Sequence, residues 1–359
     1  MDLKKILIIK PSSLGDVVQA LPIAKILKKR FHGVSLAWMV NEELSGLVEN
    51  NPYLDEIFLF KRNRWKKQLH LPFNILEFIK LVKAIRKRRF DLVIDLQGLF
   101  RSGMIAFLSG SPRRSGFRNA RELSPLFYTK KIDLPDGKIH SVERYLYAAK
   151  VLGIEDKERD FSIFVSGEDR DYVEDFLKKE KIYDTARLLI INPWARWKTK
   201  VWPMKNYILL IKKLKEKRYS PILIGSEEAR KGTEDLLRCF SDPPAVFVGQ
   251  SLKRMTALIE KASLMITNDS GPMHVAAAVR TPVIALFGPT DPHLTGPYGK
   301  GHIVIQKKLD CVPCMERKCS LLHECLTGIS VEEVFGCAEK KLEEIKTGEK
   351  DSSGVEIPE

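Results

Sequence analysis

Short apolar runs alternate with amphipathic segments along the first half of the chain. Residues 6–9 are an all-apolar run typical of a buried parallel strand, and the polar turn 10–16 precedes an apolar-periodic segment that predicts a helix over 17–31. The same pattern predicts strands at 34–40, 56–60 and 92–95, and helices at 73–88, from 97–102 onward, and at 140–152. Strands separated by helices indicate a doubly wound parallel sheet.

The alternation begins again after a charged segment, 166–186, that we interpret as a linker or a bridging helix. Strands are predicted at 188–191, 221–224, 245–248, 264–267 and 283–287, and helices at 204–217, 227–240, 252–261 and 330–345. We therefore expect an α/β protein with two Rossmann-like lobes, residues 1–165 and 187–346, whose parallel sheets face a cleft. The Gly-, Ser- and Glu-rich end, 347–359, is expected to be disordered.

Four polar turns directly follow predicted strands. Ligands of open α/β sheets bind beyond the carboxyl ends of the strands, so these turns are the candidate functional segments. They lie at 12–16, 95–101, 192–202 and 268–274, two in each lobe.

The turn at 268–274 has the most informative sequence. Pro272 suits the first helical position, where a missing N–H costs nothing, and residues 276–278 are good helix formers. A helix start of this kind offers free N–H groups to an anion, with Ser270 able to cap or donate and Gly271 allowing close approach. We interpret it as a diphosphate cradle; an ordinary strand-to-helix turn with a capping serine is an equally good interpretation.

The positive charge of the chain is concentrated in its first half. Of the net charge of +14, residues 1–160 account for most, with 30 Lys and Arg against 18 Asp and Glu. The basic clusters 61–67, 83–89 and 113–121 suit a polyanionic partner: nucleic acid, an anionic membrane surface or an acidic glycolipid. A merely solvated basic face is the alternative for any single cluster.

The start of the chain does not resemble a leader sequence. Lys4 and Lys5 precede only the short apolar run 6–9, so neither a signal peptide nor a membrane-spanning helix is indicated. We expect a cytoplasmic protein.

Four cysteines lie close together near the end of the second lobe. Cys311, Cys314, Cys319 and Cys325, with His323 nearby, have a spacing compatible with zinc or an iron–sulfur cluster. Free thiols in a structured loop are the alternative, since cytoplasmic residence argues against disulfides. Cys239 and Cys337 are interpreted as buried thiols on helices.

Several motifs in order along nearly the whole chain resemble one family, the ADP-heptose:lipopolysaccharide heptosyltransferases of glycosyltransferase family 9. They are KPSSLGD (10–16), DLQGLFRS (95–102), GFRNARE (116–122), LFY (126–128), HSVER (140–144), KVWP (200–203), GSE (225–227), TNDSGPMH (267–274) and FGPT (287–290). The resemblance implies a GT-B fold, inversion at the anomeric carbon, ADP-heptose as donor substrate and no required metal or cofactor.

An inverting transfer needs a base for the proton of the acceptor hydroxyl, and Asp16 resembles the catalytic aspartate of the family. A helix-capping carboxylate is the alternative interpretation. A helix start also favours the ionised form and weakens a base, which a base acting late in the reaction would tolerate.

The resemblance also assigns donor contacts. Lys200 and the turn at Ser270 and Gly271 would bind the diphosphate, and Asp269 would face the sugar hydroxyls. Glu227 would accept the ribose hydroxyls, the segment containing Gln250 would frame the adenine, and His274 would either reach a phosphate or pack in the core. The loop 194–199 departs from the family because it is bulky and basic; Arg196, Lys198 and Thr199 are possible substitutes for missing hydroxyl contacts.

The acceptor side is expected in the basic first lobe, facing an anionic lipid A–Kdo molecule. Arginine forks suit its carboxylates and phosphates. The candidate acceptor-binding residues are Ser12, Ser13, Gly15, Gln97, Arg101, Arg118 and Arg121. The clusters 61–67 and 83–89, with Trp65, Leu71 and Phe73, would rest on the anionic inner membrane as a peripheral contact of a monomer.

Other protein classes fit less well. A dinucleotide oxidoreductase should carry Gly-x-Gly-x-x-Gly after the first strand, yet residues 10–16 contain only Gly15. A nucleic-acid binder should show a reading helix or an RNA-binding signature, and neither is evident. Within the family, another activated sugar or core acceptor is the alternative; 116–122 favours Kdo as acceptor, whereas 267–274 favours the first heptose.

Overall fold

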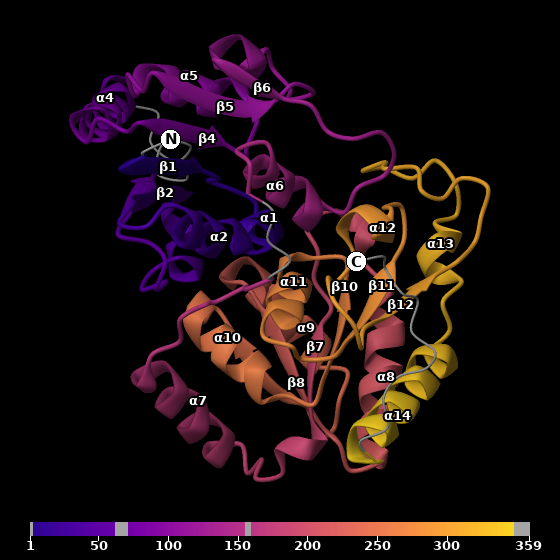
Figure 1. Cartoon of the computed structure of the whole chain (residues 1–359). Coiled ribbons are helices and arrows are strands. Elements are labelled where there is room, and N and C mark those ends of the chain that lie inside the picture. Colours follow the sequence, from indigo (N-terminus) through magenta and orange to yellow (C-terminus); the bar gives the residue numbers. More distant parts are fainter. Residues whose placement is uncertain (1–2, 62–70, 155–158, 348–359) are drawn as a thin grey trace. The chain divides into compact units, whose positions relative to one another are not determined.

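The computed structural model of the chain describes residues 3–61, 71–154 and 159–347. The chain divides into two compact units, Met1–Phe164 and Val165–Glu359, and each contains one six-stranded parallel sheet with helices (Figure 1). The expectation of an α/β protein with two Rossmann-like lobes is confirmed. The predicted cleft between the lobes concerns their relative placement and stays a prediction.

The first unit has the strand order β3-β2-β1-β4-β5-β6. Its strands are β1 (Lys5–Ile9), β2 (Ser35–Asn41), β3 (Glu56–Phe60), β4 (Leu92–Asp95), β5 (Arg113–Phe117) and β6 (Lys130–Ile132). Its helices are α1 (Leu14–Ala20), α2 (Pro22–Arg30), α4 (Leu71–Lys87), α5 (Phe100–Leu108) and α6 (Ser141–Lys150), with the 3-10 helices η1 (Glu42–Leu47) and η2 (Ser124–Phe127).

Two details of the first unit correct the predictions. The single helix expected over 17–31 is two helices, because Pro22 has no N–H to continue the ladder and begins α2. The strands β5 and β6 were not predicted, since β5 begins with two arginines and β6 with two lysines. The basic cluster predicted at 113–121 thus partly forms β5, which lies between β4 and the edge strand β6.

The second unit has the strand order β12-β11-β10-β7-β8-β9. Its strands are β7 (Leu188–Asn192), β8 (Ser220–Gly225), β9 (Ala245–Val248), β10 (Leu264–Asn268), β11 (Val283–Phe287) and β12 (Ile303–Gln306). Its helices are α7 (Gly167–Lys179), α8 (Met204–Glu216), α9 (Arg230–Leu237), α10 (Leu252–Lys261), α11 (Gly271–Ala278), α12 (Pro292–Thr295), α13 (Glu324–Thr327) and α14 (Val331–Thr347), with the 3-10 helices η3 (Thr185–Arg187), η4 (Lys198–Lys200) and η5 (Glu227–Ala229).

Three segments of the second unit compare with the predictions as follows. The segment 166–186, interpreted as a linker or bridging helix, contains α7, which packs against α10. The helix predicted over 227–240 ends earlier, at Leu237, and the prediction that Cys239 is buried on it is wrong, because Cys239 is exposed beyond that end. Of the predicted tail 347–359, only Thr347 lies within the described residues, as the end of α14.

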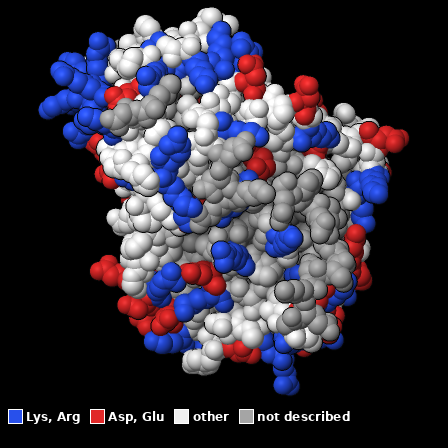
Figure 2. All heavy atoms as spheres, in the orientation of Figure 1, with Lys and Arg blue, Asp and Glu red and all other residues white. Residues whose placement is uncertain are grey.

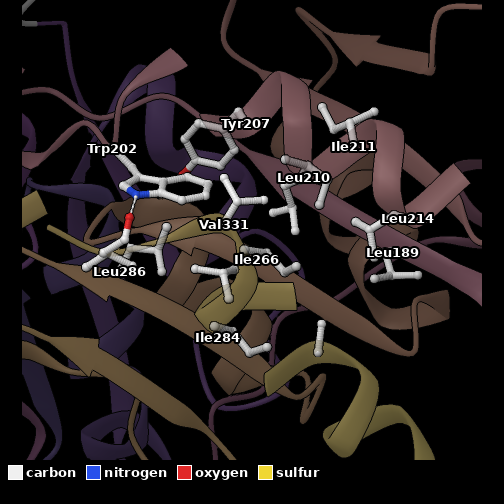
Figure 3. Packing of buried hydrophobic residues seen from close by; sticks show 14 of the residues in the cluster. Leu189, Trp202, Tyr207, Leu210, Ile211, Leu214, Ile266, Ile284, Leu286 and Val331 are labelled. Carbon is white, nitrogen blue, oxygen red and sulfur yellow. Dashed lines mark hydrogen bonds between the residues drawn. The ribbon is translucent and has the colours of Figure 1, made fainter. Parts of the chain in front are cut away.

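The core of the second unit joins one face of its sheet to α8 and α14 (Figure 3). Alternate residues of each strand point to this face, and on α8 the buried positions recur with helical spacing. The cluster includes Leu189, Ile191, Ile266, Ile284 and Leu286 from the strands, Tyr207, Leu210, Ile211 and Leu214 from α8, and Val331, Val334 and Ala338 from α14. Trp202 lies at one end of the cluster. Its ring contacts Tyr207 edge-on, with 4.9 Å between the ring centres, and its indole N–H donates to the carbonyl of Ile329 at 3.0 Å.

Two adjacent leucines of α8 test this packing. Leu210 is fully buried, so Leu210→Ala should lower the free energy of unfolding by about 3 kcal/mol through lost burial and the cavity that remains. Leu209 is 50% exposed, and Leu209→Ala should change the free energy of unfolding by less than about 0.5 kcal/mol. Urea titrations followed by circular dichroism compare the two variants, and equal midpoints would contradict the assigned face of α8.

Candidate functional site

The first candidate cluster lies where the sheet of the first unit changes its winding direction. Strands β1 and β4 are parallel neighbours, and the later strands continue outward from β4 whereas β2 and β3 lie beyond β1. The carboxyl ends at such a point are where open α/β sheets bind ligands. Lys10 and the turn to α1 follow β1 here, and Asp95 ends β4.

Asp16 stands in the first turn of α1 and is held by three residues. Its Oδ2 accepts hydrogen bonds from the hydroxyl of Ser13 at 2.7 Å and from the Ser13 backbone N–H at 3.1 Å. Its Oδ1 accepts from the hydroxyl of Tyr145 at 2.6 Å and lies 3.6 Å from the Lys10 ammonium. Ser13 is the N-cap residue of α1, and Asp16, three residues on, completes a capping box with it, so the carboxylate does take part in capping while its side chain remains 37% exposed.

The contacts of Asp16 favour its ionised form. Burial alone would raise its pKa, but the charge of Lys10 and the hydrogen bonds from Ser13 and Tyr145 outweigh it and hold the pKa well below its usual range. Lys10 itself is buried, which lowers its pKa, and its ammonium lies 4.9 Å from the centre of the Tyr145 ring. Our sequence reasoning missed both Lys10, which lies in the motif 10–16, and Tyr145, which directly follows the motif 140–144.

Asp95 is fully buried and has a structural place in this cluster. It accepts from the hydroxyl of Tyr128 at 2.7 Å and from the backbone N–H groups of Gln97 at 2.9 Å and Gly98 at 3.1 Å. Burial raises its pKa. The side-chain oxygen of Gln97 in turn accepts from the backbone N–H of Ser12 at 3.2 Å, which joins the two strand ends.

The three arginines predicted to bind the acceptor differ in their surroundings. Arg101 and Arg121 are exposed, and neither side chain has a hydrogen bond or ion pair with another described residue. Arg118 is also exposed, but it forms a two-pronged ion pair with Asp133. Gly15 is buried in α1. Of these three arginines, Arg101 and Arg121 are thus the ones available to a ligand.

The second candidate cluster lies at the corresponding point of the second sheet, between the parallel neighbours β7 and β10. Each strand ends in an asparagine, Asn192 in β7 and Asn268 in β10, whose side chain forms hydrogen bonds with the segments that follow the strands. The amide of Asn192 donates to the hydroxyls of Ser270 at 2.8 Å and Thr267 at 3.0 Å. Asn268 accepts from the Trp202 backbone N–H and the Tyr207 hydroxyl, each at 3.0 Å, and donates to the carbonyl of Pro193 at 2.9 Å.

The strand–turn–helix unit predicted after β10 is confirmed. Ser270 precedes α11 in an extended conformation, and Pro272 lies in the first turn. Ser270 does not cap the helix with its side chain, because its hydroxyl is bonded to Asn192 and Thr267. His274 is buried one turn into α11.

Lys200 and Asp269 form an ion pair beside this helix start. The ammonium of Lys200 lies 2.5 Å from Oδ2 of Asp269, and the hydroxyl of Thr290 donates to the same oxygen at 2.6 Å. The ammonium also lies 4.6 Å from the centre of the Trp197 ring. Asp269 is 5% exposed and Lys200 16%, so the lysine is the member of the pair that a ligand reaches more easily.

The predicted ribose contact, Glu227, follows β8 and is exposed. Both of its oxygens accept from the guanidinium of Arg230, at 2.6 and 2.7 Å, which lowers the pKa of Glu227. Gly249 lies against it, with a left-handed backbone (φ 73°) that favours glycine in the turn after β9; a Cβ there would also be 2.1 Å from Oε2 of Glu227. Gln250 is half-buried in the same turn. The partner Arg230 was missed by our sequence reasoning.

The four candidate metal-binding cysteines line one cavity of about 50 Å³, together with His323. Cys325 is buried, whereas Cys311, Cys314 and Cys319 are exposed, and all four are free thiols. Within residues 3–61, 71–154 and 159–347, no group of three or more His, Cys, Asp or Glu side chains is arranged to hold a metal ion. The same part of the chain contains no helix that is both long and apolar enough to cross a membrane.

Comparisons with known proteins agree with this geometry. The family model of glycosyltransferase family 9 (heptosyltransferase) matches residues 78–324. The lipopolysaccharide heptosyltransferase 1 of Pseudomonas aeruginosa is 28% identical over 325 residues, which cover 88% of this chain and 87% of that protein.

Solved structures give the same result. A glycosyltransferase family 9 protein from Veillonella parvula superposes with a TM-score of 0.84 at 24% identity, covering 96% of this chain and 98% of that one. The E. coli heptosyltransferase WaaC with ADP superposes with a TM-score of 0.75 at 25% identity, covering 94% and 99%. With a family model that matches more than half of its length and two Rossmann-like units of the GT-B type, the chain belongs to glycosyltransferase family 9, the heptosyltransferases.

Proposed function

We propose that the protein transfers heptose from ADP-heptose to the Kdo–heptose inner core of lipopolysaccharide, with inversion at the anomeric carbon. The observation that carries the proposal is a polar cluster at the ligand-binding edge of each sheet, around Asp16 in one and around Lys200 and Ser270 in the other. The similarity to a lipopolysaccharide heptosyltransferase 1 and to a heptosyltransferase with ADP supports this substrate class.

The second unit would activate the donor. As the bond from the anomeric carbon to the diphosphate oxygen breaks, negative charge develops on the departing ADP. The Lys200 side chain and the backbone N–H of Gly271 at the start of α11 would stabilise this charge. Glu227, held beside Gly249, would accept the ribose hydroxyls, and Gln250 lies in the adjoining turn. His274, Ser270, Gly271 and Asp269 would complete the donor site.

The first unit would supply the base. The acceptor hydroxyl oxygen forms the new bond to the anomeric carbon while its proton passes to a carboxylate oxygen of Asp16. Because its pKa is low, Asp16 is ionised and can accept a proton, but it is a weak base. A weak base suits proton removal late in bond formation. Arg101 and Arg121 would bind the carboxylates and phosphates of the acceptor, with Ser12, Ser13, Gly15, Gln97 and Arg118 nearby.

The protein would meet its lipid-borne acceptor through a surface formed by α4, α5 and η2. These neighbouring elements expose large apolar side chains: Ile75, Leu76 and Ile79 on α4, Phe100 and Phe107 on α5, and Leu123 and Leu126 at η2. Exposed cations accompany them, and Figure 2 shows Lys and Arg gathered over α4. Apolar and cationic side chains together suit an anionic bilayer better than nucleic acid. Of the predicted cluster 61–67, all but Lys61 lies outside the described residues.

Activity assays test the proposed function. Incubation with ADP-heptose and either Kdo-terminated or heptose-extended lipid A, followed by mass spectrometry, should give a product one heptose heavier with one acceptor. Asp16→Asn should lower turnover at least about 100-fold and leave ADP binding nearly unchanged, because only the base is lost. Asp136→Asn, at an exposed carboxylate, is the matched control. Transfer of a different sugar, or to a different core acceptor, would establish the alternative family member instead.

The role of Tyr145 gives a second prediction. Its hydroxyl stabilises ionised Asp16, so Tyr145→Phe should raise the pKa of Asp16 toward its ordinary value. The acid limb of the pH profile of kcat/KM should then move to higher pH. Carbon-detected NMR titration of the aspartate carboxyls measures the pKa, with Asp16→Asn providing the assignment. Tyr147→Phe, on the same helix, should leave both measurements unchanged, and equal behaviour of the two variants would exclude this coupling.

A third prediction concerns the membrane surface. Leu123→Asp/Leu126→Asp should weaken co-sedimentation with phosphatidylglycerol–phosphatidylethanolamine vesicles by about tenfold or more, because two exposed leucines are lost from the contact. Tyr183→Asp, at a side chain that is 78% exposed in the second unit, is the control. Binding to pure phosphatidylcholine vesicles, and binding in high salt, should be much weaker. Salt-sensitive binding to RNA that matches vesicle binding would argue for a general polyanion surface.

A further inference from the structure

The cysteine-bearing segment between β12 and α13 is a long loop with few apolar contacts. Residues 307–323 contain no helix or strand, and every residue from 313 to 322 is exposed. Loops of this length without secondary structure are uncommon in compact units and are usually functional. Few apolar contacts are available to order it, so its conformation has to depend on other interactions.

This loop nevertheless supports the segment that carries Lys200. The ring nitrogen Nε2 of His323 lies 2.7 Å from the carbonyl of Thr199, and the hydroxyl of Thr199 donates to the carbonyl of Glu316 at 2.9 Å. The backbone N–H of Met315 donates to the carbonyl of Pro289 at 2.8 Å, next to the Thr290 that bonds Asp269. The Arg317 guanidinium also covers the Trp197 ring, 4.8 Å from its centre. The loop therefore forms one wall behind the Lys200–Asp269 pair.

Four thiols, three in this loop and one at the start of α13, are a set of ligands that suits a soft metal ion. Cys311, Cys314, Cys319 and Cys325 line the same cavity, and their spacing is Cys-x2-Cys-x4-Cys-x5-Cys. Four thiolates complete a tetrahedral site for zinc or ferrous iron, which prefer sulfur ligands in this geometry. Cys325 is buried at the start of α13 and is a fixed anchor, whereas the other three lie on the exposed loop.

We propose that these four cysteines bind one thiophilic divalent ion, zinc or ferrous iron, which fixes the loop against Thr199 and so positions Lys200. The described residues contain no preformed coordination sphere, so the ion would draw the three exposed cysteines toward Cys325. Coupling of this kind between metal binding and the order of a small loop is common. The positioning part rests on the proposed role of Lys200 in donor binding; the metal site does not.

Elemental analysis tests the metal site. Protein purified anaerobically without chelators should contain about one zinc or iron per chain, and which of the two is present identifies the ion. Cys311→Ser/Cys314→Ser should retain less than about a tenth of it, whereas Cys239→Ser, at an exposed cysteine outside the loop, should retain all of it. Cobalt added to metal-free wild-type protein should give the strong visible absorption of a tetrahedral thiolate site, a measurement that does not depend on the folding of a variant.

Three results would overturn the metal site: wild-type protein without metal under these conditions, metal retained by the double variant, or a Cys311–Cys314 disulfide in anaerobically purified protein. Calorimetry with ADP tests the positioning role. Removal of the ion should weaken ADP binding about tenfold, because Lys200 loses its support. Unchanged affinity would overturn the link to Lys200. Failure of the metal-loaded protein to bind ADP at all would count against the proposed function instead.

Discussion

The second candidate cluster depends on the side chain of Asn268. This amide is fully buried at the end of β10, and its hydrogen bonds reach Pro193, Trp202 and Tyr207. A buried amide is tolerated only when its polar atoms find partners, and here two of the partners, Pro193 and Trp202, are the two ends of the segment 193–202. Lys200 lies within that segment. Its position is therefore fixed by the same bonds that satisfy the core.

Asp95 is the corresponding buried polar side chain in the first unit. It is buried at the end of β4, and its bonds to Tyr128 and to the backbone of Gln97 and Gly98 order the turn that follows. Gly116 on the neighbouring strand leaves room for the Tyr128 ring, since a Cβ there would lie 2.4 Å from it. Gln97 then holds the backbone of Ser12, next to the turn that carries Asp16. In both units a buried polar side chain at a strand end links the sheet to the candidate chemical group.

The central strands could be predicted from the sequence because they are buried on both faces and contain almost only apolar residues. The strands β5 and β6 escaped prediction because Arg113, Arg114, Lys130 and Lys131 lie near the border of the sheet, where polar side chains reach water.

The candidate site, too, could be predicted from the sequence only in part. Its turns could be predicted, since they follow from the direction of parallel strands, but the partners within it could not. Tyr145 is 129 positions from Asp16, and Thr290 is 21 from Asp269, so only the folded chain brings them together. The spacing of the cysteines was visible in the sequence, whereas their link to Thr199 through His323 and Glu316 was not.

The first cluster holds an ionised carboxylate and the second offers positive charge to a diphosphate. This difference indicates how each unit contributes to an inverting transfer. Lys10, Ser13 and Tyr145 keep Asp16 ionised, and a base of this kind accepts a proton readily only after the hydroxyl has become acidic. That happens as the acceptor oxygen bonds to the anomeric carbon, which requires ADP to be leaving already. In such a mechanism the barrier is set mainly by stabilisation of the leaving diphosphate, the task proposed for Lys200 and the start of α11. The first unit then contributes chiefly by selecting and orienting an anionic acceptor, and this agrees with the excess of Lys and Arg among residues 1–160.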